Sequence, residues 1–212
     1  MLRYIYSDDL HFYPKLAASM FRDRADQFRT RLGWPVDVDA LGEERDQYAA
    51  LNPLYVIWET ADGSHAGSMR FLPTTGRVMV NEVFSHLNPG APVVSPLIWE
   101  CTRFCLARTA GTHVAAALML AGGEIMTGFG IRHFVGVFDA RMERIYRAIG
   151  SSPELIGSQG QGRDRISIGL WEFTEDARRK VAQRAGISAE VSRLWFDRAF
   201  GLRPVRPQAL SA

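Results

Sequence analysis

An arginine and two aromatic residues are spaced near the start of the chain so that they could bind one ligand. Arg24 and Phe28 are four residues apart and would share a helix face, and Trp34 follows just past the segment. A guanidinium pairs with a carboxylate, and aromatic rings attract a cation. The trio therefore suits a ligand with both a carboxylate and a cationic centre. Solvated arginines on an amphipathic helix would give the same pattern.

Two further charged groups follow. The acidic segment 42–48 contains Glu44 and Asp46, whose carboxylates could hold an ammonium group or balance nearby arginines. An ordinary acidic surface loop is the alternative. Arg70 lies near the end of a predicted hairpin strand. These positions add a carboxylate pair and a cation to the possible site.

Glu100 and Arg103 lie inside the apolar run 96–107. An ionisable pair in such a run must be either partnered or functional, because burying an unpaired charge is costly. In an extended segment the two side chains would face opposite sides, whereas in a helix they would share one. We favour a functional role over a structural ion pair.

Composition limits the classes of function. The chain has 212 residues with 47% hydrophobic and 23% charged residues, which predicts one folded domain, and its net charge of +2 gives no argument for nucleic acid. Cys101 and Cys105 are too closely spaced on a predicted helix for a disulfide, and the five histidines are scattered without metal-ligand spacing. With no leader or membrane-span pattern, we expect a cytoplasmic protein without a metal.

Hydrophobic periodicity indicates the elements that must position these residues. Strands are predicted at 2–6, 54–58, 66–72, 134–138 and 166–173, and helices at 13–32, 113–129, 142–149, 175–185 and 189–200. Residues 98–107 read as a strand or a strand-to-helix passage, and residues 151–164 as a loop. This alternation predicts an α/β fold with three α-β-α layers around a twisted mixed sheet. We expect one domain over 1–200 and a frayed, proline-containing tail over 201–212.

Taken in order, these residues resemble the pattern of acyl-homoserine-lactone synthases: Arg-x3-Phe-x5-Trp, Glu-x-Asp-x-[Tyr/Phe]-Asp, a strand arginine, a phenylalanine and Glu-x-[Ser/Thr]-Arg. The resemblance covers about residues 1–175. The matching residues are Arg24, Phe28, Trp34, Glu44, Asp46, Tyr48, Arg70, Phe84, Glu100, Thr102 and Arg103. One position departs, because the second aspartate of the acidic loop falls on Ala49. Either Glu43, Asp39 or another carboxylate substitutes, or the donor-substrate site is altered, or activity is reduced.

The resemblance implies a fold similar to the N-acetyltransferases and a reaction between S-adenosylmethionine and an acyl group from acyl carrier protein or coenzyme A. The product would be an N-acyl-L-homoserine lactone, a quorum-sensing signal, with methylthioadenosine released. S-adenosylmethionine is then a substrate, no cofactor is needed, and the enzyme is expected to be a monomer. The implied catalytic residues are Glu100 as the base, Asp46, Arg70 and Arg103. The implied S-adenosylmethionine-binding residues are Arg24, Phe28, Trp34 and Glu44.

The acyl chain requires an apolar slot, since each buried methylene contributes about 0.8 kcal/mol. The candidate lining residues are Phe84, Trp99, Leu118, Met126 and Gly136, for which ordinary core packing is the alternative. Relatives that favour 3-oxo chains tend to carry a threonine at the position of Gly136, so the resemblance implies a preference for unsubstituted chains. Arg144 and Arg147 share a helix face and are candidates for docking an acidic carrier protein, although solvated faces often look alike.

Two rival functions remain open. A generic acyl-CoA-dependent N-acyltransferase would carry a glycine-rich pyrophosphate loop before a helix, and residues 108–113 match that loop only in part. A catalytically weakened relative that only binds ligand is suggested by Ala49, but the presence of Arg70, Glu100 and Arg103 argues against it.

Overall fold

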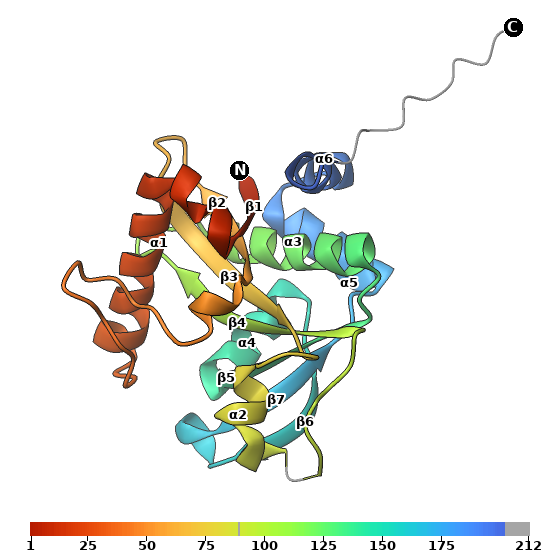
Figure 1. The fold of residues 1–212 in the computed structure, drawn as a ribbon. Helices are drawn as coiled ribbons and strands as arrows, with labels where there is room; N and C mark the ends of the chain where they lie inside the picture. Colours follow the sequence, from red (N-terminus) through yellow and green to blue (C-terminus); the bar gives the residue numbers. More distant parts are fainter. Residues whose placement is uncertain (89, 202–212) are drawn as a thin grey trace, which may run out of the picture.

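Seven strands form one mixed sheet in the computed structural model, which describes residues 1–88 and 90–201. Their order across the sheet is β1-β2-β3-β4-β5-β7-β6, and the pairing is antiparallel except between β4 and β5. The strands are β1 Leu2–Tyr6, β2 Leu54–Glu59, β3 His65–Pro73, β4 Ile98–Leu106, β5 His133–Asp139, β6 Glu154–Gln159 and β7 Ile166–Trp171. Figure 1 shows the sheet crossing the centre of the molecule.

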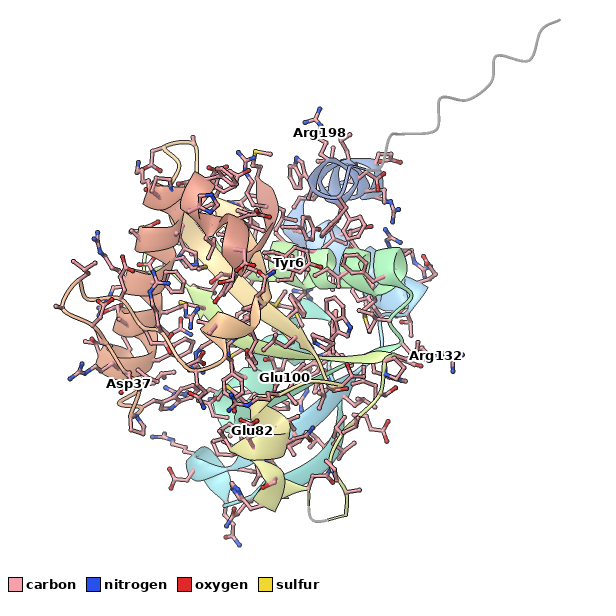
Figure 2. All side chains as sticks on the ribbon, viewed as in Figure 1. Tyr6, Asp37, Glu82, Glu100, Arg132 and Arg198 are labelled. Atoms are coloured by element: carbon pink, nitrogen blue, oxygen red, sulfur yellow. The ribbon has the colours of Figure 1, made fainter. Side chains whose placement is uncertain are left out.

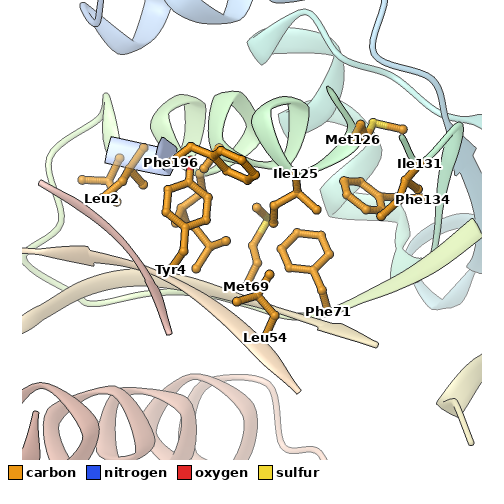
Figure 3. Close-up of a cluster of buried hydrophobic side chains, with 14 of the residues drawn as sticks. Leu2, Tyr4, Leu54, Met69, Phe71, Ile125, Met126, Ile131, Phe134 and Phe196 are labelled. Carbon is orange, nitrogen blue, oxygen red and sulfur yellow. The ribbon is translucent and has the colours of Figure 1, made fainter. Parts of the chain in front are cut away.

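Helices cover both faces of this sheet, as the alternation of elements predicted (Figure 1). They are α1 Pro14–Ala25, α2 Met79–Glu82, α3 Val114–Phe129, α4 Ala140–Ile149, α5 Glu175–Ala185 and α6 Ala189–Ala199. On one face Leu16 and Phe21 of α1 pack on Tyr55 and Ile57 of β2. On the other face the core lies under α3 and α6, and Figure 3 shows it separated from α1 by the strands. No helix within the described ranges is both long and apolar enough to cross a membrane.

The predicted helix 13–32 changes character before its end. Regular α1 stops at Ala25, and residues Asp26–Arg31 continue as a π-helical segment. The wider winding brings the side chain of Gln27 to β4, where its amide donates to the carbonyl of Phe104 at 2.9 Å and accepts from the N–H of Leu106 at 3.0 Å. Such π segments are frequent at functional sites. This one ties the first helix to a free edge of the central strand.

That free edge exists because β4 and β5 separate. Their parallel pairing covers only Ile98–Glu100 against His133–Val135. Beyond it, β4 continues to pair with β3 alone, and the register between those two strands shifts by one residue between the pairs Arg70↔Thr102 and Ser68↔Cys105. Arg103 lies in this bulge with a φ of 55°, in the left-handed region that few non-glycine residues adopt. The segment 98–107, left open between two readings, is therefore a strand with a bulge.

The prediction of a loop over residues 151–164 is wrong, because Glu154–Gln159 form the edge strand β6. Most of its side chains are exposed, so the strand lacks the alternating apolar pattern that marks a half-buried one. The other predicted strands and helices are confirmed to within a few residues. Of the predicted tail 201–212, all but Gly201 lies outside the described residues.

Candidate functional site

Three arginines and two carboxylates form a connected ionic network on the α1 side of the sheet. Glu44 bridges Arg24, at 2.5 Å, and Arg103, at 2.9 Å. Asp46 bridges Arg103, at 2.9 Å, and Arg70, at 2.5 Å. The helix, the acidic loop and two strands thus meet at one place, as the resemblance of the ordered residues implied.

Burial makes this network unusual. The side chains of Arg24, Arg70 and Glu44 are 0% exposed, while Arg103 is 9% and Asp46 10% exposed. Burial alone would favour the neutral form of Asp46, but the hydrogen bond from Arg70 and the charges of both neighbouring arginines outweigh it and lower its pKa. Breaking a buried pair from one side is strongly destabilising because it leaves an uncompensated charge. The network therefore depends on all its members.

Glu100 lies beside this network and holds the start of α2. Its carboxylate accepts the backbone N–H groups of Met79 at 3.0 Å and Val80 at 2.5 Å, and only 1% of the residue is exposed. Burial raises the pKa of Glu100, and the two amide hydrogen bonds and the charges of Arg70 and Arg103 only partly offset this effect. With Glu100 ionised, three carboxylates balance three arginines. Figure 2 marks its position next to α2.

The bulge in β4 explains how the side chains of Glu100 and Arg103 can lie in one site. In a regular strand they would face opposite sides of the sheet. The extra residue at Arg103 redirects its side chain to Asp46, the carboxylate that also binds Arg70 on β3. Arg70 in turn donates to the hydroxyl of Thr102 at 3.0 Å.

The two predicted aromatic residues adjoin the network. Phe28 and Trp34 stack with their ring centroids 5.3 Å apart and their planes at 9°. The guanidinium of Arg103 lies 5.3 Å from the centroid of Phe28. Phe28 is buried, whereas Trp34 is 37% exposed and covers it from the solvent side. One hydrogen-bond donor beside these rings is unsatisfied. Nη1 of Arg24 is buried and has no hydrogen-bond partner within the described structure.

Neither of the two named candidates to replace the aspartate at Ala49 pairs with an arginine of the network in the described structure. Glu43 pairs with the half-exposed Arg45 at 2.8 Å, and Asp39 accepts backbone N–H groups of its own loop. The arginines of the network nevertheless all have carboxylate partners. The acidic loop thus keeps its pairing with alanine at position 49.

An apolar pocket lies on the opposite face of the sheet, where β4 and β5 separate. It reaches Thr102 and Arg103 at the sheet and extends between α3, α4 and β7. Of the five residues predicted for the acyl chain, Met126 and Gly136 line this pocket. Leu118 is sealed in the core below α3, Trp99 stacks on Phe129, and Phe84 packs in a cluster with Tyr48 on the other face. These three do not line the pocket.

The predicted docking residues Arg144 and Arg147 are exposed on α4. Within the described ranges neither forms an ion pair, whereas their neighbour Arg141 is held by Asp139 at 2.9 Å. Both charges are therefore available to a partner. The sequence pattern thus placed them on a solvent face, which is compatible with docking and with simple solvation.

Some features of the site were not predicted. The amides of Met79 and Val80 are backbone groups, which no side-chain pattern can reveal. Tyr48 belongs to the predicted motif, but its partner does not: its hydroxyl donates to Glu82 at 2.9 Å, a contact that spans 34 residues of sequence. Tyr146 lines the apolar pocket. Its spacing from Met142 and Ile149 on one helix face was the signal that could have indicated it.

Comparisons with known proteins agree with this geometry. The family model of autoinducer synthases matches residues 10–181. An acyl-homoserine-lactone synthase of Rhizobium etli is 38% identical over 195 residues, covering 89% of this chain and 91% of the relative. A relative of the same description from Pseudomonas chlororaphis is 32% identical and covers 82% of this chain and 89% of its own length.

Solved structures show the same fold. The CoA-dependent acyl-homoserine lactone synthase MesI superposes with a TM-score of 0.78 at 24% identity, covering 90% of this chain and 98% of its own. The CoA-dependent synthase BjaI, solved with SAM and isopentyl-CoA, gives 0.77 at 22% identity, with 89% and 90% covered. A Lactobacillus plantarum protein described as an N-acetyltransferase gives 0.55 at 15% identity, with 82% and 99% covered. The predicted three-layer, N-acetyltransferase-like architecture is confirmed.

The ionic network predicts a large effect of a single uncharged substitution. Glu44→Gln removes the carboxylate shared by Arg24 and Arg103, and we expect it to lower the free energy of unfolding by about 3–5 kcal/mol in urea titrations. Glu43→Gln is the matched control, because its partner Arg45 is half exposed and such pairs contribute less than about 1 kcal/mol. Equal losses in the two variants would contradict the network's importance.

Proposed function

The chain belongs to the autoinducer synthase family and is an acyl-homoserine-lactone synthase, and we propose that it joins an acyl group from acyl carrier protein to S-adenosylmethionine. The amide would form first; the methionine carboxylate would then displace the sulfonium, closing the lactone and releasing methylthioadenosine. The observation that carries this proposal is the buried network of Arg24, Arg70 and Arg103 with carboxylates, beside a separation in the sheet that opens onto an apolar pocket.

The sulfonium substrate fits the polar side of this arrangement. Its carboxylate would bind Arg24, whose buried Nη1 has no partner within the described residues. Since Trp34 stacks over Phe28 and Arg24 is sealed from solvent, the stack must open to admit the substrate. The two rings would then face the sulfonium, which aromatic faces attract. Asp46 and Glu44 would orient the ammonium group.

Glu100 is the proposed general base. The amine must lose a proton before it attacks the thioester, and a carboxylate with a raised pKa is a better proton acceptor than an ordinary one. Accepting that proton would leave the surrounding arginines with one carboxylate fewer. As the C–N bond forms and the C–S bond of the thioester breaks, this proton passes to the departing thiolate, which leaves as the free thiol of the donor, and Glu100 is ionised again.

The geometry also supports the second bond-forming step. Lactone closure is intramolecular, so its barrier falls mainly through holding the methionine chain in a folded conformation. The guanidinium groups and the Phe28–Trp34 pair would provide that constraint from opposite ends of the substrate. In this scheme S-adenosylmethionine is a substrate, and no separate cofactor takes part.

We assign the acyl donor to a carrier protein because Arg144 and Arg147 on α4, the helix that carries Tyr146 of the pocket, are exposed and have no ion-pair partner within the described residues. Acyl carrier proteins are acidic, and complementary charge accelerates and orients docking. The solved relatives MesI and BjaI are described as CoA-dependent, so coenzyme A thioesters are the alternative donors.

The overall reaction is tested by incubating the purified chain with S-adenosylmethionine and either acyl carrier protein thioesters or acyl-CoA. Mass spectrometry should detect an acyl-homoserine lactone and an equal amount of methylthioadenosine. A simple N-acylated amine without methylthioadenosine would instead indicate a generic N-acyltransferase. Binding of S-adenosylmethionine without turnover would indicate a relative that only binds ligand.

Replacing Glu100 should strongly reduce catalysis and remove the acid limb of the pH profile, which is the fall of kcat/KM at low pH. Because the pKa of Glu100 is raised, the ionised base is lost on acidification at a higher pH than for an ordinary glutamate, so kcat/KM should fall from that pH downwards. Glu100→Gln should lower kcat/KM by at least about 100-fold and flatten this limb. Glu124→Gln alters an equally buried glutamate paired with Arg178 and should keep the rate. A normal acid limb in Glu100→Gln would exclude it as the base.

Charge reversal on α4 should weaken the carrier-bound donor selectively. In the double variant Arg144→Glu and Arg147→Glu, repulsion from the acidic carrier should raise the KM for the acylated carrier about tenfold or more. The KM for S-adenosylmethionine should not change. Arg198→Glu on α6, which Figure 2 places well away from Glu100, is the control. An unchanged KM for the carrier would remove these arginines from the docking surface.

A further inference from the structure

The apolar pocket is lined by a tyrosine whose hydroxyl has no hydrogen-bond partner among the described residues. Tyr146, on α4, lines the pocket and is 7% exposed. Its ring packs edge-on against Phe138 at 5.3 Å, Trp171 at 5.1 Å and Phe104 at 6.5 Å between centroids. Contacts from three elements therefore fix the ring and leave the hydroxyl little freedom of position.

The hydroxyl of Tyr146 forms no hydrogen bond within the described part of the chain. Unlike the fully enclosed hydroxyls of Tyr4 and Tyr55, it keeps some accessible surface, and the residue lines the pocket. Burial raises the pKa of Tyr146, with smaller effects from Cys101 and Asp139. The group is consequently a neutral phenol that can both donate and accept a hydrogen bond.

Two other polar groups along the pocket already have partners. The indole N–H of Trp171 donates to the carbonyl of Ser151 at 3.2 Å, and Thr102 accepts from Arg70. Ser151 lines both this pocket and an adjoining polar one that is lined by His133 and Glu154. Tyr146 differs because its surroundings are aromatic rings.

We propose that Tyr146 recognises an oxygen atom on the acyl chain, so that the enzyme prefers donors bearing a hydroxyl or keto group near the thioester. A chain without oxygen would displace water from the phenol and leave it unpaired, which is unfavourable in an apolar site. Pockets built to hydrogen-bond a substrate group discriminate strongly against analogues that lack it. This inference rests on the proposed synthase reaction.

The position of Tyr146 places that oxygen near the reacting end of the chain. Tyr146 contacts Phe104, the residue after Arg103, where the pocket meets the charged network. The thioester must lie there for the amine to reach it. Gly136, which also lines the pocket, presents no side chain, and a Cβ at this position would lie 2.9 Å from the carbonyl oxygen of Cys101. Tyr146 therefore supplies the donor that Gly136 lacks, which reverses the preference for unsubstituted chains expected from Gly136 alone.

The test compares Tyr146→Phe with the wild type on thioesters of equal chain length. Calorimetry would measure the affinity for 3-hydroxyacyl-, 3-oxoacyl- and unsubstituted acyl-pantetheine, and kcat/KM would be measured with the same acyl groups on carrier protein. Removing the phenol should lower the preference for oxygenated over unsubstituted donors about tenfold, both as a ratio of affinities and as a ratio of kcat/KM values. Tyr6→Phe, a half-buried tyrosine outside the pocket, is the matched control and should leave the ratio unchanged.

The outcomes separate the two proposals. A loss of affinity and of kcat/KM confined to the 3-hydroxy donor or to the 3-oxo donor would support the assignment and identify the oxygen that is recognised. An unchanged ratio, or an equal loss for all donors, would overturn it. If no donor yields lactone with the wild type, the proposed reaction fails, but the affinity ratio still decides whether Tyr146 recognises oxygen.

Discussion

The structure depends on keeping six buried charges neutral as a group. Arg24, Arg70 and Arg103 are paired by Glu44 and Asp46, and Glu100 lies beside them. Because isolated charges are too costly to bury, each element that contributes one must stay in place. The first helix, the acidic loop and strands β3 and β4 are therefore held together by the groups proposed to bind substrate. Stability and function draw on the same contacts at this site.

The second constraint is the separation of β4 from β5. Two strands that paired throughout would isolate the charged face of the sheet from the apolar pocket beneath α3 and α4. Pairing instead ends at Glu100 and Val135, and the bulge turns Arg103 towards Asp46. Gln27 of the π segment satisfies the backbone groups that this separation leaves free. Hydrogen bonds from the π-helical segment after α1 thus stabilise the opening at which the two substrates are proposed to meet.

The sequence predicted much of this arrangement, but unevenly. Periodicity located the helices and most strands, and the ordered motif selected the members of the ionic network. Hydrophobic periodicity missed β6, because the exposed residues of this strand carry no alternating pattern. It also left the segment around Arg103 undecided between strand and helix, because a bulge interrupts the period. Phe84, Trp99 and Leu118 have the right chemistry for an acyl pocket, but side-chain type does not show which core surfaces adjoin a cavity. Backbone donors such as Met79 leave no trace in sequence.

The most direct test of this account is the number of protons exchanged when S-adenosylmethionine binds, measured by calorimetry in buffers of different ionisation enthalpy. The proposed substrate would bring net positive charge to a cluster that is neutral only when Glu100 is ionised. As the pH is lowered towards the pKa of Glu100, binding should release an increasing fraction of a proton in the wild type and none in Glu100→Gln. Equal proton release in the two proteins would contradict the account.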